Sequence, residues 1–293
     1  MAQALIDCSE NLLGRYRAPM RDLTPRPGFF TNFLGLRTQT SLFPHAAPFD
    51  GQVIGGLPRP SDQVYGGEIE YAALLSAIED GDGETFTAIE LGAAWGPWVS
   101  AAGVVCRRSG YKAINLIAVE ACRIKVQTLR DHFAANDLDV LEPTIIHGAA
   151  WKENGTLRFP SALAVDDYGA RAEEHEGIDY RGHALATEAV PAFSLQAICG
   201  NHQRIDYIHW DIQGAEYDVA ASAVDLMQER VARVCIGTHS RKIEGDLFQL
   251  FHGMGWDLLW ERPCGFTYDA TKPTLEGMTH SDGEQVWANP HLL

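Results

Sequence analysis

The sequence predicts a doubly wound α/β fold, in which a mostly parallel sheet of seven strands ends in an antiparallel last strand and follows an irregular N-terminal arm. Two observations lead to this prediction. From residue 67 onward, short β-rich runs alternate with segments of helical periodicity, which is typical of parallel strands joined by covering helices. Before residue 67, the chain is rich in Pro, Gly and aromatic residues and shows neither helical nor strand periodicity.

The composition is that of a globular protein with an acidic surface. Of the 293 residues, 46% are hydrophobic and 21% are charged, which suffices for a sizeable buried core. Lys and Arg total 23 against 39 Asp and Glu, and the net charge of −16 at pH 7 repels a phosphate backbone. We therefore expect no nucleic-acid partner.

Membrane and metal signatures are missing from the sequence. No apolar run approaches the roughly 20 residues that cross a bilayer, and residues 1–17 have neither a basic opening nor a secretory apolar stretch. The cysteines are isolated and no CxxC pair occurs, which indicates neither a disulfide framework nor a structural zinc site. We expect a cytoplasmic protein without a membrane partner.

The composition and the periodicity of the chain change at about residue 66. Residues 1–66 are predicted to form an arm or cap, which serves either as a lid over a cleft or as a contact in a homodimer. Residues 67–293 are predicted to form the α/β domain, beginning with an amphipathic helix in EIEYAALLSAIED. A polar excursion at about 152–200 interrupts the alternation, and its pieces GTLRF and ALATEAV are suited to a hairpin.

Seven segments of the α/β domain are predicted strands. They are residues 86–91, 114–120, 144–150, 205–212, 231–238, 256–261 and 284–288. Amphipathic helices fall between several of them, for example with Val126, Leu129 and Phe133 on one apolar stripe. The last two strands are joined by a Pro- and Gly-rich connection without a helix, so the final strand is expected to return antiparallel.

The first two strands end in features that suit a nucleoside. The first ends in Glu90 and continues into the turn GAAWG (92–96), where a backbone without large side chains lets a ligand approach the carboxyl edge of the sheet. The second ends in Glu120, whose carboxylate can accept hydrogen bonds from both hydroxyls of a ribose. The dinucleotide motif GxGxxG is absent, so a nicotinamide-dependent oxidoreductase is the second interpretation.

Several motifs occur in an order that a known family shares. They are IELGAAWGPW, AVEA, IIHGAAW, IDYIHWDIQGAEYDV, VCIGTHS and DGEQVWANPHL, all within residues 67–293. Together they resemble the FkbM-type family of class I S-adenosylmethionine-dependent methyltransferases, and the D-x-x-G-A-E segment is the most specific of them. Glu90 stands where the family often has Asp, and residues 1–66 have no counterpart.

The resemblance implies a Rossmann-like fold, S-adenosyl-L-methionine as the cofactor and a role for each matching residue. The turn beside the amino-acid end of the cofactor would be formed by Glu90, Gly92, Ala93 and Gly96. Glu120 would hold the ribose. Gly148 and Ala149, at the end of the third strand, would lie near the adenine, with tight packing between strand and loop as the alternative.

Three polar residues near the ends of the fourth and fifth strands are candidates for the chemistry. Asp211 closes one strand, Glu216 follows in the QGAE turn, and His239 closes the next strand, so the three are expected to converge at one edge of the sheet. His239 would accept the proton of an acceptor hydroxyl, and Asp211 would orient the acceptor or the cofactor. Glu216 would support that pair or cap its helix. A divalent ion held by the three is the less favoured alternative, because no metal-binding spacing supports it.

Aromatic residues also follow the strand ends. Trp95, Trp98 and Trp151 can stack on an adenine or a sugar ring there, although packing beneath a loop is the more common role of such residues. Tyr168 is expected in a solvated loop, with a place beside the acceptor as the alternative.

The favoured interpretation is an S-adenosylmethionine-dependent O-methyltransferase that acts on a hydroxyl of a small molecule, sugar or glycan. Besides the oxidoreductase, a scaffold that binds a nucleoside without catalysis remains as an alternative.

Overall fold

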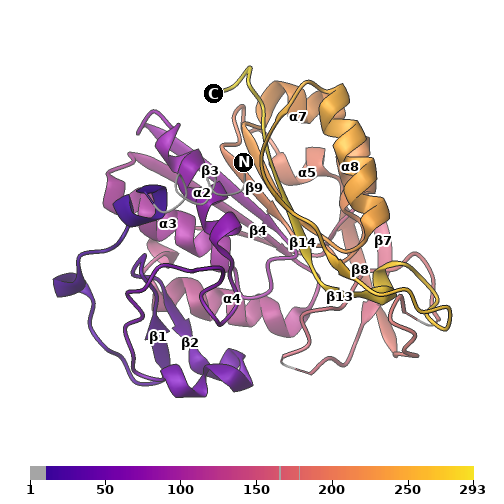
Figure 1. The fold of residues 1–293 in the computed structure, drawn as a ribbon, viewed down its shortest axis with the longest axis horizontal. Coiled ribbons are helices and arrows are strands. Elements are labelled where there is room, and N and C mark those ends of the chain that lie inside the picture. Colours follow the sequence, from indigo (N-terminus) through magenta and orange to yellow (C-terminus); the bar gives the residue numbers. More distant parts are fainter. Residues whose placement is uncertain (1–10, 165, 178) are drawn as a thin grey trace.

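The computed structural model describes residues 11–164, 166–177 and 179–293, and its centre is a seven-stranded sheet (Figure 1). The strands are β3 (Thr85–Leu91), β4 (Ala113–Glu120), β5 (Thr144–His147), β9 (Tyr207–Trp210), β10 (Arg233–Thr238), β11 (Asp257–Arg262) and β14 (Gly283–Ala288). Their order is β11–β14–β10–β9–β3–β4–β5, and only β14 runs antiparallel to its neighbours. The predicted doubly wound, Rossmann-like fold with an antiparallel last strand is confirmed.

Helices cover both faces of this sheet. They are α2 (Glu68–Glu79), α3 (Pro97–Ser109), α4 (Arg123–Ala135), α5 (Leu195–Cys199), α6 (Glu216–Ser222), α7 (Val224–Arg230) and α8 (Arg241–Gly253). The alternation of side chains along β3 sends Phe86 and Ala88 into the core with α2, α3 and α4, while Ile89 and Leu91 join the core with α5 to α8. Figure 1 shows these two sets of helices on opposite sides of the strands.

The excursion carries a small sheet of its own. It contains β6 (Ala149–Ala150), β7 (Gly155–Pro160) and β8 (Thr187–Phe193) in the order β6–β8–β7. β7 and β8 pair antiparallel, as the sequence predicts for the two pieces of the hairpin. The prediction of one continuous strand at 144–150 was wrong, because β5 ends at His147 and the chain beyond Gly148 pairs with β8 instead of with β4.

The described part of the arm packs on the domain. It contains β1 (Phe29–Thr31) and β2 (Arg37–Gln39), which pair antiparallel, and the 3-10 helices η1 (Met20–Asp22), η2 (Thr40–Leu42) and η3 (Pro44–Phe49). Phe33, Leu34 and Leu36 enter the core beside α2 and α3. The expectation of an arm also covers residues 1–10, which lie outside the described residues.

Short elements complete the chain. They are η4 (Asp139–Leu141), β12 (Gly265–Phe266), η5 (Glu276–Met278) and β13 (Thr279–Ser281). Within the described residues, no helix has both the length and the apolar character needed to cross a membrane.

Gly92 permits the close approach of two strand ends. Its φ is 74°, and a Cβ at this position would lie 1.9 Å from the backbone oxygen of Asp211. The Asp211 amide donates to the Leu91 carbonyl at 3.0 Å, so neither backbone can withdraw without breaking the contact between β3 and β9.

We expect Gly92→Ala to lower the free energy of unfolding by about 3 kcal/mol, because it adds a backbone clash to the cost of a positive φ. Gly83 is the matched control, since its φ is 77° and nothing lies within 4 Å of an added Cβ. Gly83→Ala should cost only about 1 kcal/mol. Urea unfolding measures both variants, and equal costs would contradict the importance of the close approach.

Candidate active site

Glu90 holds the start of α3. Its Oε2 accepts hydrogen bonds from the backbone N–H groups of Trp98 at 3.1 Å and Val99 at 2.8 Å. A carboxyl group at this position satisfies donors that the first turn of a helix leaves free. Glu90 is buried, and burial raises its pKa well above the usual value despite these hydrogen bonds.

Glu120 closes β4 and bridges two turns. Its Oε2 accepts from the Ala94 N–H at 2.7 Å and its Oε1 accepts from the Cys122 N–H at 2.6 Å. Burial raises the pKa of this carboxyl, although the nearby Lys125 acts in the opposite direction. Each oxygen keeps a further lone pair, which is available to a hydroxyl of a ligand.

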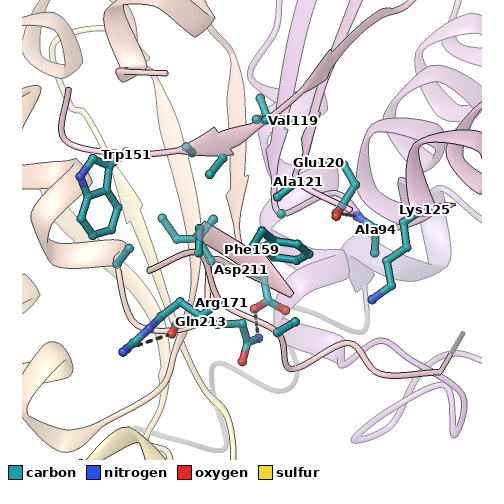
Figure 2. Close-up of a pocket in the computed structure, with 18 of the residues that line it drawn as sticks. Ala94, Val119, Glu120, Ala121, Lys125, Trp151, Phe159, Arg171, Asp211 and Gln213 are labelled. Carbon is teal, nitrogen blue, oxygen red and sulfur yellow. Dashed lines mark hydrogen bonds between the residues drawn. The ribbon is translucent and has the colours of Figure 1, made fainter. Parts of the chain in front are cut away.

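A narrow cleft lies over the carboxyl ends of the central strands (Figure 2). Of the residues predicted to bind the cofactor, those that line it are Gly92, Glu120, Gly148, Ala149 and Asp211. Gly148 also has a packing role, because an added Cβ would lie 2.6 Å from both the Phe193 ring and the Pro191 carbonyl oxygen. Both interpretations of Gly148 therefore have a structural basis.

A wider cavity of about 510 Å³ adjoins the cleft. Of the predicted residues, it is lined by Glu90, Gly92, Ala93 and Asp211. Gly92 and Asp211 line both spaces, which places them at the junction. Among the residues predicted to bind the cofactor, Gly96 is the exception, since it lines neither the cleft nor this cavity. Its φ is 73°, and an added Cβ would lie 2.2 Å from Cδ1 of Leu129, so it serves the packing of α3 against α4.

Asp211, Glu216 and His239 converge, as their positions in the sequence predict. The Nδ1 atom of His239 lies 2.9 Å from Oε1 of Glu216, and its Nε2 atom lies 3.3 Å from Oδ1 of Asp211. Glu216 has no exposed surface, and His239 is 3% exposed and lines neither the cleft nor the cavity. Of the three, Asp211 is the one that lines both.

The charges of this group follow from its geometry. Burial alone would lower the pKa of His239, but the negative charges of Glu216 and Asp211 outweigh it and hold the pKa well above the usual value. For Asp211, the contact with His239 outweighs burial, and its pKa lies below the usual value. These directions favour a positively charged His239 beside an ionised Asp211.

This arrangement bears on two roles that the sequence suggests for His239. A protonated His239 would have no lone pair with which to accept a proton, which disfavours the role of base. With both ring nitrogens facing carboxylates, it is not suited to hold a metal ion together with Asp211 and Glu216 either. Among the described residues, no group of three His, Cys, Asp or Glu side chains is arranged for a metal ion.

Sequence reasoning missed Gln213, which fixes the other side of Asp211. Its Nε2 donates to Oδ1 of Asp211 at 2.6 Å (Figure 2). Its Oε1 accepts from the Tyr180 hydroxyl at 3.0 Å. Gln213 has a φ of 57°, which is uncommon for a residue other than glycine. It stands at an unspecified position of the D-x-x-G-A-E segment, and nothing else in the sequence marks it.

The excursion supplies a wall that the sequence does not predict. Lys125 of α4 donates to the backbone oxygen of Asp167 and lies 4.2 Å from the centre of the Tyr168 ring. The Tyr168 hydroxyl donates to the Leu42 carbonyl of the arm at 3.1 Å. Tyr168 is half-buried in its loop and lines both the cleft and the cavity, which fits the alternative of a place beside a pocket better than a fully solvated loop.

Two of the three tryptophans past the strand ends are buried. Trp95 and Trp98 are 7% and 3% exposed and line the cavity, whereas Trp151 is half-buried and lines the cleft. They therefore combine packing with a place beside a ligand.

Comparisons with known proteins agree on a family. The methyltransferase FkbM domain matches residues 82–246. A protein of Jannaschia sp. (strain CCS1), described as a "Putative methyltransferase", is 31% identical over 274 residues, which cover 92% of this chain and 95% of that protein. The chain belongs to the FkbM methyltransferase family. This membership favours methyl transfer over the oxidoreductase and the scaffold.

The solved structures that resemble this chain are distant from it in sequence. Methyltransferase FkbM from Methylobacillus flagellatus KT is 15% identical with a TM-score of 0.42, and the similarity covers 69% of this chain but only 43% of that one. A precorrin-6y C5,15-methyltransferase from Geobacter metallireducens GS-15 is 10% identical with a TM-score of 0.42, with coverage of 78% and 90%.

We expect Glu216→Gln to lower the pKa of His239 and to cost about 3 kcal/mol of stability, because one carboxylate of a buried ion pair is lost. The folded-state pKa of His239 is raised, so the stabilisation is fully present below about pH 6.5 and is lost as the pH rises through the folded-state pKa. Nitrogen-15 NMR of the imidazole measures this pKa, with Glu229→Gln on the surface of α7 as the control. A wild-type His239 that titrates at or below its usual pKa would contradict the ion pair.

Proposed function

We propose that this methyltransferase uses S-adenosylmethionine to methylate a hydroxyl group of a small molecule, sugar or glycan. One observation carries the proposal. Asp211 accepts a hydrogen bond from Gln213, faces Nε2 of His239 at 3.3 Å, and lies where a cleft suited to a nucleoside meets a cavity large enough for an acceptor. Membership of the family supports the methyl transfer, and the geometry of Asp211 supports the hydroxyl acceptor.

The cleft fits the nucleoside part of the cofactor. Glu120 would hold the ribose hydroxyls with the lone pairs that its two backbone contacts leave free. Gly148 and Ala149 would border the adenine, and Trp151 offers an aromatic face at the same cleft. The turn at Gly92 and Ala93 would adjoin the amino-acid end, near Glu90. When bound, the cofactor supplies a methyl group activated by a sulfonium.

Asp211 is the proposed proton acceptor. Transfer of a methyl group from a sulfonium is an in-line displacement, so placing the acceptor oxygen at the junction supplies much of the rate. The proton on that oxygen becomes far more acidic as the new C–O bond forms, and a weakly basic carboxylate suffices to take it. The hydroxyl proton passes to Asp211, which releases it to solvent after the reaction.

His239 and Glu216 are proposed as positioning residues instead of proton carriers. His239 keeps Asp211 ionised by its positive charge and turns one carboxylate oxygen toward the ring. Glu216 fixes His239 and also accepts from the backbone N–H of Gly214 at 3.0 Å, which shapes the loop that follows Asp211.

For the arm, we propose the role of a lid. Phe43, Pro44, His45, Val64 and Tyr65 line the cavity, so this segment covers the space proposed for the acceptor. A change of oligomeric mass after truncation of the arm would support a dimer contact instead.

Isothermal titration with S-adenosylmethionine, S-adenosylhomocysteine and NAD tests the cofactor. We expect the two sulfur nucleosides to bind and NAD not to bind. Glu120→Ala should weaken their binding by about tenfold to a hundredfold, because hydrogen bonds to a charged acceptor are lost. Glu229→Ala is the matched control on the surface of α7. Binding of NAD alone would contradict the proposal.

The pH dependence of turnover tests the roles of Asp211 and His239. With an acceptor found by screening hydroxylated metabolites and glycans, kcat should fall by about a hundredfold or more in Asp211→Asn. In the wild type, the rate should be lost as the pH falls through the lowered pKa of Asp211 and again as it rises through the raised pKa of His239. A base at His239 requires the opposite sign above neutral pH, namely a rate that rises as the imidazolium loses its proton.

A further inference from the structure

The cavity beside Asp211 combines aromatic rings with carboxyl groups. Its rings are Phe43, Tyr65, Trp95, Trp98 and Tyr168. Its carboxyl groups are Glu70, Glu90, Asp166 and Asp211. None of the described residues that line it is Lys or Arg, whereas the cleft has both Lys125 and Arg171. The cavity therefore differs in charge from the space proposed for the nucleoside.

The rings pack against one another in a single cluster. The ring centres of Phe43 and Trp95 lie 4.8 Å apart, those of Trp95 and Tyr168 lie 4.9 Å apart, and those of Tyr65 and Trp95 lie 5.3 Å apart. The arm supplies Phe43 and Tyr65, the turn before α3 supplies Trp95, and the excursion supplies Tyr168. Because these three segments hold one another, the aromatic faces are fixed before a ligand arrives.

Two of the carboxyl groups have little exposed surface, since Glu90 is buried and the side chain of Glu70 is 16% exposed. Glu70 accepts from the Gly67 N–H at 2.7 Å and lies 3.3 Å from Nε2 of His209. Burial lowers the pKa of His209 to about 4, so that ring is neutral, and burial raises the pKa of Glu70 to about 8. Glu90 has backbone donors as its partners. An entering positive charge would favour the ionised form of both groups and lower their pKa.

We propose that this cavity binds an ammonium group of the methyl acceptor, so that the substrate is a hydroxylated amine or quaternary ammonium compound. Aromatic faces combined with carboxylates are the recurrent means by which proteins recognise such cations. The volume of about 510 Å³ is that of a small-molecule site. This inference rests on the proposed function, because it assigns the cavity to the acceptor of the same reaction.

The amino-acid end of the cofactor would reach the cavity at the turn of Gly92 and Ala93, but the rest of the cavity fits it less well. That end carries a carboxylate as well as an ammonium group, and the described lining offers no Lys or Arg to the carboxylate. The ammonium group of an acceptor carries only a positive charge, which no Lys or Arg of the described lining supplies. The net charge of −16 attracts such an acceptor from solution as well.

The test compares choline with 3,3-dimethyl-1-butanol, which has the same shape without the charge. Both are titrated into the protein saturated with S-adenosylhomocysteine and into the free protein, and ligand-observed NMR measures their binding. We expect choline to bind about tenfold more tightly than the alcohol in both states. Glu70→Gln should remove most of this preference, whereas Glu229→Gln on α7 should retain it.

Two results would overturn the inference, and a third would contradict the proposed function. Equal binding of the two probes by the wild type would overturn the inference and leave methyl transfer intact. Choline that binds only the free protein and is displaced by S-adenosylhomocysteine would assign the cavity to the cofactor, which also overturns the inference. If S-adenosylhomocysteine fails to bind, the proposed function is contradicted, while the preference for choline over the alcohol in the free protein still decides the nature of the cavity.

Discussion

The buried contact between Glu216 and His239 is the constraint on which the geometry of the site depends. Glu216 opens α6, and its Oε1 receives the Nδ1 side of His239 together with the backbone N–H groups of Ile212 and Gly214. One oxygen thus ties the end of β10 to the loop that leaves β9. Because an unpaired charge in this position would be costly, the contact fixes both the loop and the protonation state of the ring. That arrangement positions Asp211 beside His239 and lowers the pKa of its carboxyl group.

The three acidic residues at the edge of the sheet differ in what compensates them. Glu90 and Glu120 receive hydrogen bonds from backbone amides, and for both of them burial outweighs these bonds and raises the pKa. Asp211 faces an imidazolium, which outweighs burial and lowers its pKa. Backbone dipoles orient a carboxyl group, whereas a full charge also keeps it ionised. Carboxyl groups at adjacent strand ends are therefore suited to different roles, namely capping for Glu90 and the proposed binding and proton acceptance for Glu120 and Asp211.

The fold could be predicted from the sequence because the strands are continuous apolar runs whose periodicity is local. The convergence of Asp211 and His239 could be predicted as well, since the topology of a parallel sheet brings strand ends together. The burial of His239 could not, because it depends on Glu216 and on a loop whose shape no local pattern reveals. The break at Gly148 follows from the packing of Phe193, and the place of Tyr168 follows from Leu42, so each depends on a contact between distant parts of the chain.

The sheet supplies one part of the site, and the arm and the excursion supply another. This difference determines where specificity for the acceptor can reside. The strand ends carry Glu120 and Asp211, the residues proposed for the nucleoside and for the proton, and local hydrogen bonds fix both of them. The walls of the cavity come from the arm through Phe43 and Tyr65 and from the excursion through Tyr168, and these segments meet at Trp95. A change in these walls can alter which acceptor is held without moving Asp211 or Glu120. The specificity for the acceptor therefore resides outside the sheet, in the segments whose structure the sequence predicts least.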